Sequence, residues 1–241
     1  MLPTELPEVP GAELAATYLA APDRLDIGGD WYDALRLPDG RILLSIGDIV
    51  GHDQRAAATM GPIRAVLRAY AIEDPDPAAA LVRLNRFILT GYPAGTLNTA
   101  VVAIYQPQTR ELRWANAGHP APLLATLSPE SVPGGTVVET LDERGPVLGV
   151  YAEVAFPLAT RTLAPGAAFC CYTDGLLERR GSTADADETR LVRAVARAFA
   201  GASPAQRMVE QITTQMLAPD PPEDDVCLLV LRTSASGEAA W

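Results

Sequence analysis

Four aspartates along this 241-residue chain stand in the same local setting, at one end of an apolar strand-like run. They are Asp30, Asp48, Asp174 and Asp224. Mg²⁺ and Mn²⁺ prefer carboxylate oxygens, and two such ions about 3.5–4 Å apart can activate water and hold a phosphoryl group. A single aspartate beside a strand is more often a turn residue or a helix cap. The repeated setting nevertheless indicates an acidic metal site. The spacing alone does not show that the four side chains converge.

The stretch GGDWYD at residues 28–33 places one of these aspartates beside two large aromatic residues. Trp31 and Tyr32 favour burial, whereas an unpaired carboxylate in a core costs free energy. A strand end satisfies both demands if the aromatic rings pack inward and Asp30 faces a cation. Asp33 then either reaches the metal through a water molecule or has a structural role, for example as a turn cap.

The sequence offers little for other metal or nucleophile chemistry. Its two histidines, His52 and His119, lack the dense His/Cys spacing of a zinc site. The three cysteines are too few for a disulfide framework, and we expect them to be buried, reduced thiols: Cys170, Cys171 and Cys227. None of them is followed six positions later by an arginine that could bind phosphate. A cysteine-based phosphatase is therefore disfavoured.

Composition and charge narrow the class of protein. The chain is 48% hydrophobic and 20% charged, which is ordinary for a soluble globular domain. A net charge of −11 argues against binding to nucleic acid or to an anionic membrane surface. No apolar run approaches the ~20 residues that span a bilayer, and two glutamates precede any apolar stretch at the N-terminus. We therefore expect a cytoplasmic protein.

The chain reads as one domain between two short ends. Prolines at positions 3, 7 and 10 predict an extended lead-in or linker over residues 1–12, which suggests an upstream sensory domain as a possible partner. Residues 13–233 form the expected domain, because no repeat or break in composition divides them. Residues 234–241 are expected to be a flexible tail.

Hydrophobic periodicity predicts strands that outnumber helices. A turn at 38–40 leads into a strand at 42–46, strands flank a turn at 106–109, and a short apolar run follows Pro122. Residues 128–146 look looser, and further strands end at Thr173 and span 226–232. Helices are expected at 54–71, 77–89, 187–200 and 203–217. Strands that are neighbours in sequence favour antiparallel sheets with helices packed outside.

Two details of the helices can be read directly from the sequence. Met60, Ile63, Leu67 and Tyr70 recur at helical spacing on one face of the first helix, and we expect them in the core. Asp76 followed by Pro77 is a typical N-cap and first-turn pair for the second helix.

Five motifs in order resemble the metal-dependent protein phosphatase family, which is protein phosphatase 2C-like. They are GGDWYD, GDIVGHD, NAGHPAPLL, YTDGLLE and DDVCLLVL, spread over residues 28–231. More narrowly, they resemble its bacterial branch of stage II sporulation protein E and the stress-response sigma-factor regulators. The resemblance implies an α+β fold, a four-layer α-β-β-α sandwich of two antiparallel sheets packed face to face with helices outside.

The resemblance also implies an activity and a site. The activity is that of a serine/threonine protein phosphatase, in which a metal-activated water hydrolyses phosphoserine or phosphothreonine on a regulatory protein, typically an anti-anti-sigma factor. Two Mn²⁺ or Mg²⁺ ions would bind Asp30, Asp48, Asp174 and Asp224, with Asp48 bridging and the Ile49 carbonyl adding an oxygen. Asp224 is preferred to Asp225 because the family's ligand is the first of that pair.

Other residues of the motifs have smaller expected roles, and the match has two departures. His52 is a candidate general acid for the leaving serine oxygen, and His119 is expected to brace a turn. Asp53 replaces the glycine that usually ends the family's Gly-His-Gly loop, and Cys227 stands where threonine is frequent. These departures leave open a catalytically weak pseudo-phosphatase that binds phosphoproteins. A two-metal phosphodiesterase or nuclease is disfavoured by the acidic charge.

Overall fold

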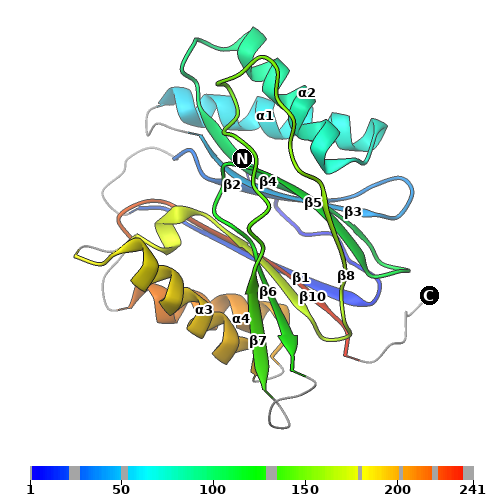
Figure 1. The fold of residues 1–241 in the computed structure, drawn as a ribbon, viewed down its shortest axis with the longest axis vertical. Coiled ribbons are helices and arrows are strands. Elements are labelled where there is room, and N and C mark those ends of the chain that lie inside the picture. Colours follow the sequence, from blue (N-terminus) through cyan, green and yellow to red (C-terminus); the bar gives the residue numbers. More distant parts are fainter. Residues whose placement is uncertain are drawn as a thin grey trace.

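Two antiparallel five-stranded sheets pack face to face, and a pair of helices covers the outer face of each (Figure 1). The computed structural model describes residues 2–21, 28–49, 54–128, 135–178, 181–200, 203–218 and 222–235, with the backbone only for 54–58. One sheet has the order β1 (Ala12–Leu19), β10 (Val226–Thr233), β9 (Ala168–Tyr172), β6 (Leu123–Leu127) and β7 (Thr136–Thr140). The other has the order β2 (Trp31–Arg36), β3 (Ile42–Ile49), β4 (Asn98–Gln106), β5 (Glu111–Ala117) and β8 (Ala159–Thr162). The predicted α-β-β-α sandwich is confirmed.

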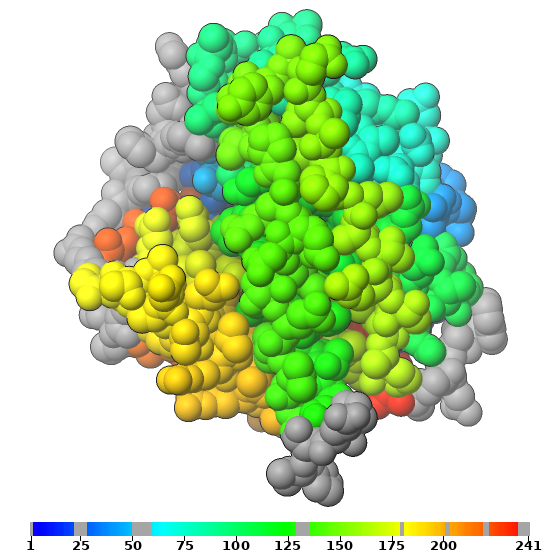
Figure 2. Space-filling model, viewed as in Figure 1, coloured from blue at the N-terminus to red at the C-terminus, as the bar shows by residue number. Residues whose placement is uncertain are grey.

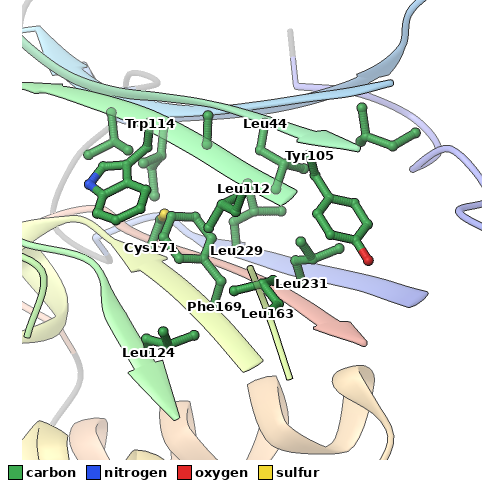
Figure 3. Close-up of a cluster of buried hydrophobic side chains, with 14 of the residues drawn as sticks. Leu44, Tyr105, Leu112, Trp114, Leu124, Leu163, Phe169, Cys171, Leu229 and Leu231 are labelled. Carbon is green, nitrogen blue, oxygen red and sulfur yellow. The ribbon is translucent and has the colours of Figure 1, made fainter. Parts of the chain in front are cut away.

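The layer between the sheets is a continuous apolar core (Figure 3). Along β10, the side chains of Cys227, Leu229 and Leu231 enter this layer, whereas Leu228 and Val230 pack toward the helices on the outer face. This alternation follows from the two-residue period of a strand. Because both faces are covered, β10 reads in the sequence as an uninterrupted hydrophobic run.

Helices α1 (Gln54–Glu73) and α2 (Pro77–Gly91) cover the β2–β3–β4–β5–β8 sheet. The predicted stripe on α1 is confirmed, because Met60, Ile63 and Leu67 are buried and Tyr70 packs against the same core cluster. The predicted N-cap of α2 is also present, since the Asp76 carboxylate accepts a hydrogen bond from the Ala79 amide at 3.0 Å.

Helices α3 (Ala184–Ala200) and α4 (Ala205–Leu217) cover the other sheet. In the space-filling view, the green and yellow-green segments around β6, β7 and β8 separate the yellow and orange α3 and α4 from the cyan α1 (Figure 2). No described helix is long and apolar enough to cross a membrane.

Three strands were not predicted. The sequence of β1 is rich in alanine, yet all eight of its residues pair with β10, so tertiary pairing overrides local preference. The expected loose stretch at 128–146 contains β7, a partly exposed strand at the edge of its sheet. β8 is a short strand at the edge of the other sheet.

The segment that precedes β1 also contributes to the core, because its residue Val9 is buried between the sheets.

Candidate metal centre

Two of the four aspartates lie side by side on the β2–β3 pair. Asp30 directly precedes β2, and Asp48 is the second-last residue of β3. Trp31 pairs with Gly47 in the antiparallel register of these strands, which brings Asp30 next to Asp48. The Trp31 side chain is buried under α1 and α2, as the sequence predicted for an aromatic residue at this strand end.

The other two aspartates come from the ends of β9 and β10 on the opposite sheet. Asp174 begins the short 3₁₀ turn η1 (Asp174–Leu176) that follows β9, and Asp224 lies two residues before β10. The Thr173 amide donates to the Cys227 carbonyl at 3.1 Å, and the Cys227 amide donates to the Thr173 hydroxyl at 2.8 Å. These two hydrogen bonds hold the two strand ends in register.

The two sheets bring three of the aspartates together. One carboxylate oxygen from each of Asp30, Asp48 and Asp174 lies within 4.8 Å of the other two. Asp224 is outside this group of three, but its charge raises the pKa of both Asp30 and Asp174. The donors are all carboxylate oxygens, which suit a hard divalent cation.

The glycines of GGDWYD make room for the cluster. A Cβ on Gly29 would overlap the carbonyl oxygen of Ile49 and would lie 2.8 Å from Oδ1 of Asp48. The Ile49 carbonyl and an Asp48 carboxylate oxygen therefore face the same small volume beside Gly29. A Cβ on Gly28 would overlap the Asp225 carboxylate. These glycines permit close approach of the backbone, a role that the sequence assigned to glycines beside the aspartates.

The carboxylates of the cluster disfavour one another's charge. Asp30 is 3% exposed, and burial together with the charge of Asp48 raises its pKa to about 9. Burial and the charge of Asp174 raise the pKa of Asp48 to about 6, and burial and Asp224 raise the pKa of Asp174. Oδ2 of Asp30 is buried and has no hydrogen-bond partner among the described residues. A divalent cation would satisfy this oxygen and offset the repulsion, so the residues present fit a metal ion.

Asp225 has a different environment from its neighbour Asp224. Its buried carboxylate accepts hydrogen bonds from the Tyr18 hydroxyl and from the Ala21 amide, each at 2.9 Å. Its amide donates to Oδ1 of Asp224 at 2.7 Å. Asp225 thus fastens the end of β1 to the start of β10, while the Asp224 side chain is half-buried. Because the Asp225 carboxylate is engaged in these contacts, Asp224 stays the predicted ligand of the pair.

His119 braces the loop after β5. Its backbone amide donates to the Asn116 side chain at 2.8 Å, and the Asn116 amide group donates to the His119 carbonyl at 3.0 Å. Its Nδ1 lies 2.8 Å from the Thr99 hydroxyl, and burial lowers its pKa to about 3. The expected bracing of a turn is therefore seen. His52 and Asp53 lie outside the described residues.

Asp33 is part of a buried ion pair that the sequence did not predict. The Arg68 guanidinium donates two hydrogen bonds to its carboxylate, and Arg64 lies 3.3 Å away. The sequence left two roles open for Asp33, and these contacts correspond to the structural role. A carboxylate in a strand and arginines four residues apart on a later helix were the only signal in the sequence.

All three cysteines are buried and free, as expected. Burial raises the pKa of each thiol, to about 12 for Cys170. A thiolate nucleophile is therefore disfavoured at neutral pH.

Comparison with known proteins agrees with the fold and the motifs. The profile of the family described as stage II sporulation protein E matches residues 38–234. The crystal structure of the RsbU and RsbW domains of Rv1364c from Mycobacterium tuberculosis is 34% identical, with a TM-score of 0.82 over 95% of this chain and 62% of that chain. The catalytic domain of the serine/threonine protein phosphatase PstP with two manganese ions shares the fold, at 17% identity and a TM-score of 0.66 over 92% of this chain and 98% of that chain.

Among curated proteins, protein IcfG of Synechocystis sp. is 24% identical over 209 residues, which cover 76% of this chain. The match spans 31% of IcfG, so this chain corresponds to about a third of that protein. The family match covers most of the chain and includes three of the four aspartates at the strand ends. The chain therefore belongs to the stage II sporulation protein E family and has a PP2C-like phosphatase fold.

Proposed function

We propose that this domain is a metal-dependent serine/threonine protein phosphatase whose substrate is a phosphorylated regulatory protein of the anti-anti-sigma factor class. The convergence of Asp30, Asp48 and Asp174 at the junction of the two sheets carries the proposal. Two Mn²⁺ or Mg²⁺ ions are the proposed cofactors. The manganese ions of PstP and the RsbU and RsbW domains of Rv1364c support the choice of metal and of substrate class.

The chain's own residues would hold and orient the ions. Asp30, Asp48, Asp174 and Asp224 are the proposed ligands, together with the Ile49 carbonyl oxygen. Bound ions would supply a water of lowered pKa and would neutralise charge on the phosphoryl oxygens. Thr173 has a positioning role, because its hydroxyl hydrogen-bonds the Asp30 carboxylate and accepts from the Cys227 amide. His52 remains the candidate general acid.

The deciding experiment measures Mn²⁺-dependent phosphate release from a phosphoserine-bearing anti-anti-sigma domain. We expect turnover by the native chain, and at least a hundredfold loss in Asp174→Asn, which removes one proposed ligand charge. Asp185→Asn is the matched control, because Asp185 is exposed in the first turn of α3, outside the cluster. Metal affinity is measured in parallel by calorimetry.

Three outcomes separate the hypotheses. Activity that requires metal and is lost only in Asp174→Asn supports the phosphatase and its ligand set. Metal binding without turnover of any phosphoprotein would instead favour the pseudo-phosphatase. A native chain that binds no Mn²⁺ would overturn the metal site itself.

A further inference from the structure

A cavity of about 320 Å³ opens beside the aspartate cluster. Asp48 and Asp174 line one part of it, and its volume lies at the lower end of the range for small-ligand sites. Other lining residues come from the loop after β5, the loop after β7 and the start of α3: Gly118, His119, Pro120, Ala121, Arg144 and Glu188. The cavity is therefore where a group bound to the cluster would extend.

Arg144 is the one cationic residue among those that line this cavity in the described part of the chain. Its side chain is 49% exposed, and within the described residues it forms a long ion pair of 3.4 Å with the exposed Asp142. Such exposed pairs contribute little to stability, so the guanidinium is available to a ligand at small cost.

The backbone beside Arg144 is held firmly, although the side chain is exposed. The Gly145 amide donates to the Asn116 carbonyl at 2.8 Å, and the Gly118 amide donates to the Gly145 carbonyl at 3.1 Å. The same Asn116 side chain braces His119 in the cavity wall. Arg144 thus extends from a backbone segment that is hydrogen-bonded to the cavity wall. Ligand binding would therefore not have to order this segment, which lowers the entropy cost of binding.

A phosphorylated ligand in this cavity would need a cationic side chain beside it, because the negative charges around the cavity already balance two divalent ions. The four carboxylates of the proposed ligand set would balance two divalent ions, and Glu188 adds a further negative charge to the cavity wall. A phosphoserine brings a charge of about −1.5 to −2 at pH 7. Among the described lining residues, only Arg144 offers a compensating charge, and a guanidinium suits phosphate oxygens because it can donate two parallel hydrogen bonds.

We propose that this cavity receives the phosphorylated side chain of the substrate and that Arg144 is a positioning residue that binds its phosphoryl group. This inference rests on the proposed function, because the phosphoryl group is placed beside the Asp48–Asp174 side of the cavity. Arg144 would act mainly on substrate binding, and so on KM more than on kcat.

The test compares Arg144→Ala and Arg144→Lys with Arg41→Ala. Arg41 is the matched control, because it also pairs with an aspartate two residues earlier but lies at the β2–β3 turn. Inorganic phosphate is the probe, titrated by calorimetry into the Mn²⁺-loaded proteins, so the readout does not depend on turnover. We expect phosphate affinity to fall about tenfold in Arg144→Ala, to recover partly in Arg144→Lys, and to be unchanged in Arg41→Ala.

Steady-state kinetics with a phosphoserine peptide provide the second readout. We expect KM to rise about tenfold in Arg144→Ala with kcat changed less than threefold. Native phosphate affinity in Arg144→Ala overturns the inference, whether or not the native enzyme turns over. Failure of the native enzyme to hydrolyse any phosphoprotein, with phosphate affinity still lowered in Arg144→Ala, would count against the proposed function and not against the phosphate site.

Discussion

The Asp33 carboxylate accepts two hydrogen bonds from the Arg68 guanidinium, at 2.5 and 2.6 Å, and so ties β2 to α1. Asp33 is 1% exposed, and the nearly buried Arg64 lies on the same side of α1. The link begins three residues after Asp30, so it fixes the strand that presents a proposed ligand to the helix that packs behind it.

Asp33→Asn should lower the free energy of unfolding by about 3 kcal/mol, because it removes the buried carboxylate charge that faces both the Arg68 guanidinium and Arg64. Urea denaturation of the metal-free protein measures this. Asp39→Asn is the control: Asp39 pairs with Arg41 in an exposed turn, so its loss should cost less than about 1 kcal/mol. Equal effects of the two substitutions would show that the Asp33 pair contributes no more than a surface contact.

Gly29→Ala should weaken Mn²⁺ binding at least tenfold and destabilise the protein by about 2 kcal/mol, because the added methyl group would displace the Ile49 carbonyl. Calorimetric titration with Mn²⁺ checks the first effect, and urea denaturation checks the second. Gly61→Ala in α1 is the matched control, since its added Cβ would meet no atom within 4 Å apart from its chain neighbours and the backbone of its own helix. That control should be stabilised by about 0.5–1 kcal/mol through helix propensity. Native metal affinity in Gly29→Ala would contradict the placement of the site.

Without metal, the protein should become less stable as pH rises from 7 to 8. The folded pKa of Asp30 is raised to about 9 from 3.8, so its stabilising contribution is complete below pH 3.8 and is lost as pH rises through 9. The expected slope is up to about 1.4 kcal/mol per pH unit. Denaturation in a chelator at both pH values measures it, and saturating Mn²⁺ or Asp30→Asn should remove it. A slope that survives in Asp30→Asn must come from another group.

His119 should remain neutral in the folded protein from pH 8 to pH 5. Burial lowers its folded pKa to about 3 from 6.5, so its contribution to stability is present above pH 6.5 and is lost as pH falls toward 3. The NMR shift of its ring Cε1 should stay constant over this range. In urea the same signal should titrate near pH 6.5. Titration of the folded signal near 6.5 would mean that the imidazole is solvated.

Local sequence patterns predicted the elements whose signals lie within a few residues. The Asp76–Pro77 pair marks the start of α2, and the spacing of Met60, Ile63 and Leu67 marks the buried face of α1. Three strands escaped prediction because their stability comes from neighbours. The alanine-rich β1 is held by β10, more than 200 residues away, and β7 and β8 are short strands at sheet edges.

The candidate site likewise combines features that local sequence patterns indicated with contacts that they did not. The residue types around Asp30, Asp48 and Asp174 indicated a metal site, but only the resemblance to a family implied that they converge. The ion pair between Asp33 and Arg68, 35 residues apart, had no local signal, and neither did the place of Arg144 beside the cluster. Such contacts depend on how two sheets and a helix stack, which no short spacing encodes.

The carboxylates of the cluster come from both sheets: Asp30 and Asp48 from one, Asp174 from the other. The distance between the two groups is therefore set by the thickness of the apolar layer around Trp114, Phe169 and Leu229 (Figure 3). An ion at this position would act as a cross-link at the open end of the sandwich. Metal affinity and the spacing of the sheets would then be linked in one equilibrium, so a change of side-chain volume deep in the core should alter metal affinity without touching a ligand.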